Sequence, residues 1–322
     1  MNKCTVSLAE VEGFRERVEE ALRDAVRSDD AYLTEIASHL IVAGGKRVRP
    51  LFAIASASAS GQANPSDEVV LGGVAVELVH LGSLYHDDVI DEAPTRRTVE
   101  SVNARWGNLT AILAGDFLLA RASEIAASLG TEVAGLLAAT IGRLCEGEVA
   151  ELRTAYNVDR TEGAYLSAIE GKTASLFATA CRIGAIVGGV PRPDVEALTR
   201  FGLAYGMAFQ IVDDVLDVTA TEEELGKPAG HDLVEGVYNL PVLRALCGRD
   251  DGLGDLLGAP IEGAALEKAL AIIRSDGAVA SSMTTARDYA ASAIGELDGF
   301  RGGEGAAWVR TAVDQLFARV TV

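Results

Sequence analysis

The distribution of proline limits the fold of this chain more than any other sequence feature, because proline lacks a backbone donor and clashes inside a helix. The 322 residues include only eight prolines, and none lies between positions 95 and 190 or after Pro260. Those intervals are rich in alanine, leucine, glutamate and arginine, which favour helices. No alternating run of β-branched residues supports a sheet. We therefore expect an all-α fold, and a single domain over residues 1–322 because no change in composition marks a boundary.

Two long helices can be placed from local signals. Positions 64–67 read Asn-Pro-Ser-Asp, which would supply Asn64 as an N-cap, a proline at the first helical position and an acidic first turn. Apolar residues then recur at helical spacing until Pro94 ends the pattern. A second long helix is expected from Phe201 to Val218.

Charge and composition exclude several functions. Lys plus Arg number 28 against 47 Asp plus Glu, so a net charge of −19 makes the chain a poor partner for nucleic acid. Four cysteines without Cys-x-x-Cys spacing indicate reduced thiols. The N-terminus lacks the apolar core of a signal peptide, and no uninterrupted apolar stretch reaches the ~18 residues of a membrane span. We expect a cytoplasmic protein without an integral membrane segment.

The residues that could carry chemistry are concentrated in two acidic motifs, each near the end of an apolar helix. Both read Asp-Asp-x-x-Asp, at residues 87–91 and 213–217, and residues four apart share a helix face. Two carboxylates ~5 Å apart repel by about 3 kcal/mol at an effective dielectric near 20. Six carboxylates facing one cavity would therefore need cations or large pKa shifts, and Mg²⁺ suits oxygen ligands with positions open for phosphate. The predicted metal ligands are Asp87, Asp88, Asp91, Asp213, Asp214 and Asp217.

Basic residues lie close to these motifs in the sequence, and several adjoin glycine. Lys46 and Arg49 belong to Gly-Gly-Lys-Arg-Val-Arg-Pro before the first motif, and an arginine pair follows that motif at 96–97. Lys172 lies in the proline-free middle, and Lys227 follows the second motif in Gly-Lys-Pro. Glycine permits close backbone approach to phosphate, and guanidinium matches its geometry. These residues predict a pyrophosphate pocket.

Together these segments resemble the trans-isoprenyl diphosphate synthases, or polyprenyl synthetases. The resemblance runs from Gly44 to about Leu243 and includes Glu-Leu-Val-His at 77–80, Leu-Ala-Gly-Asp at 113–116 and Lys-Thr-Ala at 172–174. It implies the isoprenoid synthase fold, a bundle of long helices around a central cavity, usually in a homodimer. It also implies a prenyltransferase that uses several Mg²⁺ ions to condense isopentenyl diphosphate head-to-tail with an allylic diphosphate, with peripheral membrane contact for product release.

The resemblance also implies roles for individual residues. The implied catalytic residues are Asp87, Asp88, Asp91, Arg96, Lys172, Asp213, Asp214 and Lys227. Isopentenyl diphosphate would be held by Lys46, Arg49, His80 and Arg97. The allylic diphosphate would be held by Arg96, Lys172, Thr173, Gln210 and Lys227. Val237 stands where many relatives have lysine and Thr98 where they have glycine, so we expect one missing contact and an altered loop, with activity retained.

Product length should depend on the cavity wall below the first motif. Ser83 and Val79 precede Asp87 by one and two helical turns, and Gly82 and Ser83 occupy positions where short-chain members carry a bulky aromatic. The small residues predict a medium- to long-chain product, geranylgeranyl or longer. If they serve only tight helix packing, a shorter farnesyl or geranylgeranyl product is the alternative.

The sequence argues against three other classes of protein. A non-catalytic regulatory subunit would be expected to have lost some of the six aspartates, which this chain keeps. A terpene cyclase would need no isopentenyl-binding set, and a di-iron bundle would need Glu-x-x-His pairs.

Overall fold

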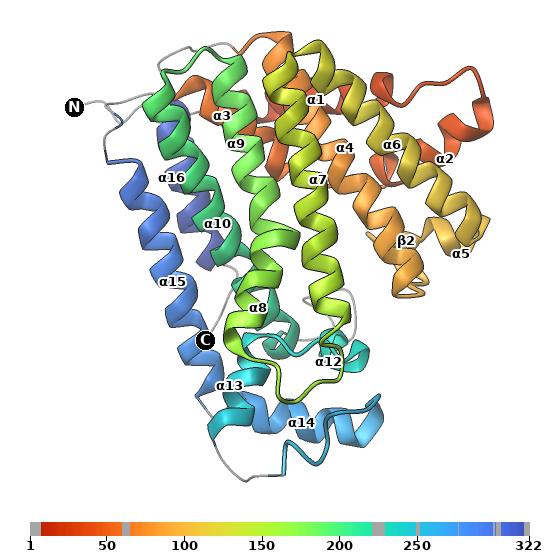
Figure 1. The fold of residues 1–322 in the computed structure, drawn as a ribbon, viewed down its shortest axis with the longest axis vertical. Coiled ribbons are helices and arrows are strands. Elements are labelled where there is room, and N and C mark those ends of the chain that lie inside the picture. The colour runs from red at the N-terminus through yellow and green to blue at the C-terminus, as the bar shows by residue number, and fades with distance from the viewer. Residues whose placement is uncertain are drawn as a thin grey trace. The chain divides into compact units, whose positions relative to one another are not determined.

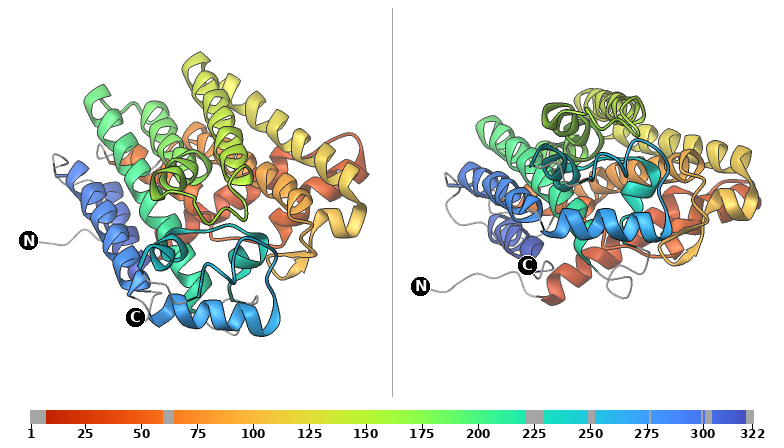
Figure 2. Two further views of the ribbon diagram at one scale, coloured as in Figure 1. Left: turned by 60° about the horizontal axis from the view of Figure 1, so that its bottom comes forward. Right: turned by 90° about the horizontal axis from the view of Figure 1, so that it is seen from below.

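A computed structural model describes residues 8–59, 65–220, 229–248, 252–275, 277–298, 300 and 304–318. These residues are overwhelmingly helical, as the views in Figures 1 and 2 show, and within them the only strands form one two-stranded hairpin. The predicted all-α class is therefore confirmed. The helices, in chain order, are α1 (Leu8–Ala25), α2 (Ala31–Val42), α3 (Val48–Ser58), α4 (Asp67–Ile90), α5 (Val102–Trp106), α6 (Asn108–Ser128), α7 (Thr131–Leu152), α8 (Glu162–Ile169), the π-helical turn η1 (Glu170–Ala174), α9 (Ser175–Val187), α10 (Arg192–Thr219), α12 (His231–Glu235), α13 (Leu240–Gly248), α14 (Gly263–Ser275), α15 (Ala278–Glu296) and α16 (Glu304–Phe317).

The chain forms two compact units, each assembled from three separate stretches. The described parts of Met1–Ile141, Leu176–Gly202 and Glu296–Thr311 form unit 1, and those of Gly142–Ser175, Leu203–Gly295 and Ala312–Val322 form unit 2. Because each unit combines stretches that are distant in the sequence, no change in composition marks where one ends. The single domain over residues 1–322 stays a prediction.

Helix α4 is the central element of unit 1. It begins after Ser66, whose hydroxyl accepts from Val69 N at 3.4 Å, so the predicted start is wrong and Pro65 precedes the helix. Among the described helices only α4 is long and apolar enough to cross a membrane, and most of it is buried in the structure. It is a core helix that packs mainly against α6 and also against α3 (Figure 1).

A pair of glycines brings α4 and α6 together. A Cβ atom at Gly82 would lie 3.1 Å from the carbonyl oxygen of Gly115, and a Cβ at Gly115 would collide with the ring of His86. A larger residue at Gly82 would press against the backbone of α6, and one at Gly115 would displace the ring of His86. The crossing therefore fixes the C-terminal end of α4, which carries the first acidic motif.

Aromatic side chains fill the core of unit 1 beside α3. Phe52 on α3 packs edge-to-face on Phe177 at 5.7 Å and stacks on Phe201 at 5.8 Å. All three rings are fully buried, so they anchor α3 against α9 and α10.

In unit 2, α10 carries the second acidic motif, and it begins at Arg192 rather than at Phe201 as predicted. Pro193 lies in its first turn, where proline leaves no intrahelical hydrogen bond unmade. A second glycine pair joins α7 to η1, because a Cβ at Gly147 would lie 2.6 Å from Lys172 N and one at Gly171 would lie 2.9 Å from Arg143 O. Lys172 is thereby fixed in a π-helical turn, a geometry that is frequent at functional sites.

The thiols agree with the predicted lack of disulfides as far as they are described. Cys145, Cys181 and Cys247 are free, and Cys4 lies outside the described residues.

Candidate active site

The first acidic motif, at the end of α4, divides its aspartates by burial. Asp88 is fully buried, whereas Asp87 is half-buried and Asp91 is exposed. The Oδ1 atom of Asp88 accepts from Nε of Arg96 at 2.6 Å, and Nη2 of the same arginine lies 2.6 Å from that oxygen in an ion pair. Its Oδ2 atom is buried and accepts no hydrogen bond from the described residues. Burial raises the pKa of Asp88, and the charge and hydrogen bond of Arg96 oppose that shift. The contact with Arg96 means that the carboxylate of Asp88 holds this arginine in place.

A hairpin places the two arginines that follow the motif. Strands β1 (Thr95–Arg96) and β2 (Val99–Glu100) pair antiparallel, and the turn residues Arg97 and Thr98 have φ of 51° and 65°. Two positive φ values are typical of the type I′ turn that suits a hairpin. Thr98 thus keeps the left-handed conformation that glycine adopts readily, at a cost of about 1–2 kcal/mol. Nη1 of Arg97 donates to Leu40 O at 2.9 Å and also to Gly44 O.

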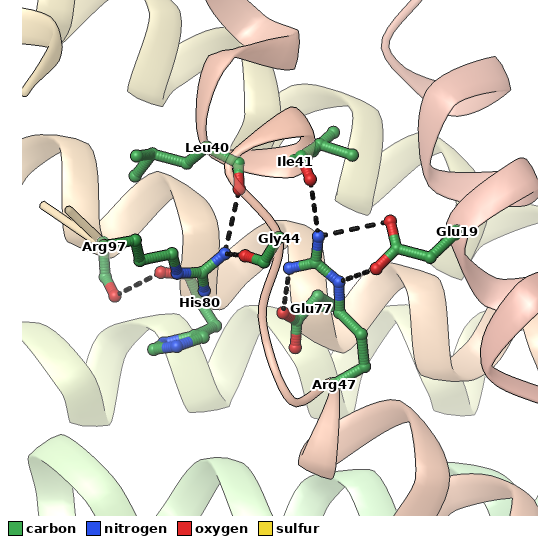
Figure 3. Close-up of polar contacts among 9 residues, drawn as sticks. Glu19, Leu40, Ile41, Gly44, Arg47, Glu77, His80 and Arg97 are labelled. Carbon is green, nitrogen blue, oxygen red and sulfur yellow. Dashed lines mark hydrogen bonds and ion pairs between the residues drawn. The ribbon is translucent and has the colours of Figure 1, made fainter. Parts of the chain in front are cut away.

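Arg47, to which the sequence analysis assigned no role, lies across the loop at Gly44 from Arg97 (Figure 3). It is 2% exposed and adopts φ of 49° at the start of α3. Its guanidinium donates to both carboxylate oxygens of Glu19, at 2.6 and 3.3 Å, to Glu77 Oε1 at 3.1 Å and to Ile41 O at 2.9 Å. The bonds to Glu19 and Glu77 raise its pKa despite burial, which acts in the opposite direction.

The loop at residues 44–46 is consequently held between the buried guanidinium group of Arg47 and the half-buried one of Arg97. A Cβ at Gly45 would lie 2.9 Å from Nη1 of Arg47 and 3.0 Å from Nη1 of Arg97, so a larger residue there would displace the ends of these arginines. The loop leads to Lys46, which is exposed, and to Arg49, whose guanidinium lies 4.6 Å from the ring centre of Phe177.

His80 lies among these arginines on α4. Burial lowers its pKa well below the usual value, and the positive charges of Arg49, Arg97, Arg47 and Arg96, in that order, lower it further. The imidazole is therefore neutral and can donate one hydrogen bond to an anion. Of the predicted isopentenyl-binding set, the structure brings Arg49, His80 and Arg97 together, and it places Lys46 on the adjoining loop.

The second motif, on α10 in unit 2, is also divided by burial. Asp213 is exposed, whereas Asp214 and Asp217 are 5% and 4% exposed. Oδ1 of Asp214 accepts from Nε2 of Gln210 at 2.8 Å, and Oδ2 accepts from the hydroxyl of Tyr165 at 2.5 Å. Burial raises the pKa of Asp214 to about 7, although these two hydrogen bonds lower it. Oδ2 of Asp217 accepts from Asp232 N at 3.2 Å.

Further polar contacts join the predicted allylic-diphosphate residues of unit 2. The hydroxyl of Thr173 donates to Oε1 of Gln210 at 2.8 Å. Nζ of Lys172 lies 2.7 Å from carboxylate oxygens of both Glu148 and Glu151. The sequence analysis missed both glutamates, although they lie three residues apart beside Gly147 on α7.

Some predicted residues and relations remain predictions. Lys227 lies outside the described residues. The first motif belongs to unit 1 and the second to unit 2, so their predicted convergence on one cavity stays a prediction.

The donor chemistry fits Mg²⁺. Carboxylate oxygens are the hard ligands that Mg²⁺ prefers, and the side chains of Asp87, Asp91 and Asp213 are accessible to an ion. Across the described ranges, no three His, Cys, Asp or Glu side chains already form a metal-binding group. Mg²⁺ is commonly held by one or two carboxylates together with water and substrate phosphate, so such a group is not required.

The residues predicted to set product length differ in their surroundings. Ser83 is half-buried and donates to His80 O at 2.9 Å, and Val79 is 1% exposed. Gly82 instead lies at the α4–α6 crossing, where a Cβ atom would lie 3.2 Å from Leu119 Cγ. Tight helix packing, the alternative explanation for the small residues, therefore applies to Gly82.

Comparison with known proteins agrees with the site. The family described as polyprenyl synthetase matches residues 30–272. The chain is 42% identical over 288 residues to nonaprenyl diphosphate synthase of Mycobacterium tuberculosis (87% of this chain, 85% of the relative). It is 42% identical over 284 residues to heptaprenyl diphosphate synthase component 2 of Geobacillus stearothermophilus (88% of each). A polyprenyl synthase of Caulobacter crescentus, solved with calcium and isoprenyl diphosphate, superposes with a TM-score of 0.90 at 34% identity (96% of this chain, 95% of that one). The chain therefore belongs to the polyprenyl synthetase family and is a prenyltransferase.

Proposed function

We propose that this chain is a Mg²⁺-dependent trans-polyprenyl diphosphate synthase that condenses isopentenyl diphosphate head-to-tail with an allylic diphosphate. The observation that carries the proposal is the placement of Arg97 and His80 beside the loop that leads to Lys46 and Arg49 (Figure 3), in a chain whose net charge is −19. Arginines collected against such a charge balance suit a multiply charged anion such as a diphosphate.

In unit 1, isopentenyl diphosphate would be held by Arg49, His80 and Arg97 together with Lys46. The loop that carries Lys46 is fixed by Arg47 and Arg97, so its ligands need little reordering on binding. Arg96, oriented by Asp88, would contact the allylic diphosphate.

In unit 2, Lys172, Thr173 and Gln210 would contact the allylic diphosphate, with Lys227 as a further cation. Lys172 is balanced by Glu148 and Glu151, and its ammonium group has three donors to share between these carboxylates and a phosphate oxygen. The aspartates of both motifs would bind several Mg²⁺ ions, and the accessible ones, Asp87, Asp91 and Asp213, are the best placed to do so.

The chemistry requires that the allylic carbon–oxygen bond break with its electron pair leaving on pyrophosphate. Bound Mg²⁺ supplies Lewis-acid neutralisation of that leaving charge. The protein adds fixed cations, which stabilise developing negative charge without reorganisation. The double bond of isopentenyl diphosphate then forms the new carbon–carbon bond, and a proton is lost to the released pyrophosphate. No side-chain nucleophile is needed.

We expect a medium- to long-chain product, geranylgeranyl or longer. Relatives named as nonaprenyl and heptaprenyl synthases support that length. The test is incubation with labelled isopentenyl diphosphate, Mg²⁺ and each allylic primer, followed by sizing of the dephosphorylated product. Elongation that requires Mg²⁺ is expected, and no elongation with any primer would overturn the proposal. A farnesyl product would favour the short-chain alternative.

We expect a homodimer, in line with the family resemblance and with the exposed leucines of α6, Leu109 at 73% and Leu113 at 58%. Relatives named as component 2 of heptaprenyl synthases favour a second candidate, in which this chain works with a different subunit. Light scattering and activity of the purified chain separate the two, because only the first predicts an active dimer without another protein. We further expect a cytoplasmic enzyme that contacts the membrane surface to release its product.

A further inference from the structure

We propose that Tyr165 is a positioning residue for this reaction, whose hydroxyl fixes Asp214 and, through Gln210, Thr173. The inference rests on the proposed function, because Gln210 and Thr173 matter here as ligands of the allylic diphosphate. Tyr165 itself lies on α8, outside every sequence motif that indicated chemistry.

The contact between Tyr165 and Asp214 is short and buried. The phenolic oxygen lies 2.5 Å from Oδ2 of Asp214, at the short end of hydrogen bonds from a hydroxyl to a carboxylate. Tyr165 is 1% exposed and Asp214 is 5% exposed, so water does not compete for either group. A hydroxyl in this place determines where the carboxylate lies.

The carboxylate passes this constraint to the amide of Gln210. Its second oxygen accepts from Nε2 of Gln210, which leaves Oε1 of the same amide to accept from the hydroxyl of Thr173. An amide donates only through its nitrogen, so Asp214 sets which end of Gln210 faces Thr173. The hydrogen bonds run from α8 across α10 to η1, the turn that also carries Lys172.

Arg160 adds a positive charge close to this contact. Its guanidinium lies 5.7 Å from the ring centre of Tyr165 and interacts electrostatically with Asp214. Arg160 is 6% exposed, and Nη1 donates to Tyr238 O at 3.1 Å. A buried cation beside the pair favours the carboxylate as an acceptor and holds the ring in its place.

The decisive variant is Tyr165→Phe, which removes the hydroxyl and preserves the ring. A tenfold change in a binding constant corresponds to about 1.4 kcal/mol. We expect the KM for the allylic diphosphate to rise at least about tenfold, with the KM for isopentenyl diphosphate changing less than about twofold. Calorimetric titration with inorganic pyrophosphate and Mg²⁺, which needs no turnover, should show binding weakened by a similar factor.

Tyr238→Phe is the matched control. Tyr238 is a fully buried tyrosine of the same unit, and its backbone carbonyl accepts from Arg160, but its hydroxyl accepts from Gly258 N at 2.6 Å and not from an aspartate of the motif. Loss of this bond should lower thermal stability without changing either KM. If Tyr165→Phe behaves like Tyr238→Phe, Tyr165 is merely structural and the inference is overturned.

A double-mutant cycle with Asp214→Asn tests the route of the effect. If Tyr165 acts through Asp214, adding Tyr165→Phe to Asp214→Asn should cause little further loss of pyrophosphate binding. Fully additive losses would contradict the inference. Wild-type protein that fails to bind pyrophosphate with Mg²⁺ would overturn the proposed function and the inference together, whereas equal binding by wild type and Tyr165→Phe would overturn the inference alone.

Discussion

Replacing Arg47 with methionine tests whether the cation-lined loop of unit 1 is held by a buried ion network. The Arg47 side chain is 0% exposed, and its partners Glu19 and Glu77 are 19% and 3% exposed. Methionine keeps much of the volume but leaves two carboxylates without their shared cation. Removing one partner of a buried ion pair destabilises a protein by about 3–5 kcal/mol, and we expect Arg47→Met to fall in that range.

The assay is urea unfolding followed by circular dichroism, with the free energy of unfolding extrapolated to water. Arg105→Met is the matched control, because Arg105 is 48% exposed and lies 3.9 Å from Glu35, a surface pair worth about 0–1 kcal/mol. Adding Glu77→Gln to Arg47→Met should restore part of the lost stability, since it removes the most buried unpaired charge. Arg47→Met within about 1 kcal/mol of wild type would refute the assignment of a buried ion network.

Three further predictions concern individual residues of unit 1. Ser83→Phe should shorten the product, because it fills a half-buried position one turn before Asp87, and an unchanged product distribution would place the cavity floor elsewhere. The pKa of His80 is lowered in the folded protein, so below about pH 6.5 the unfolded chain binds a proton that the folded chain does not, and the free energy of unfolding decreases as the pH decreases. In urea unfolding measured between pH 7 and pH 5, His80→Asn should make this decrease smaller by up to about 1.4 kcal/mol per pH unit. Identical slopes for wild type and variant would contradict the pKa shift. Thr98→Gly should stabilise the protein by about 1 kcal/mol, because it removes the backbone strain of a threonine at φ of 65°. A thermal unfolding midpoint that does not rise would show that the turn is unstrained.

The sequence was sufficient for the helical class and for locating both acidic motifs, because proline placement and residue spacing are local properties. It was insufficient for the contacts that fix those motifs. Asp214 lies 49 positions from Tyr165, and Arg47 lies 28 positions from Glu19, so only the fold brings these partners together. Gly82 illustrates the same limit, since its small size predicts either an open cavity or tight helix packing, and only the structure shows its place at the crossing with α6.

The paired aspartates of each motif make sense from helix geometry. Adjacent residues on a helix point about 100° apart, so in a doublet one side chain can face outward while its neighbour faces the core. Both motifs follow this pattern, with Asp87 and Asp213 the more accessible members and Asp88 and Asp214 buried. Each buried aspartate binds a donor from another segment, Arg96 in unit 1 and Tyr165 in unit 2. The doublet thus joins an outward carboxylate suited to a metal with an inward carboxylate that anchors the site, so substituting the buried member should disturb the placement of its partner before it removes a metal ligand.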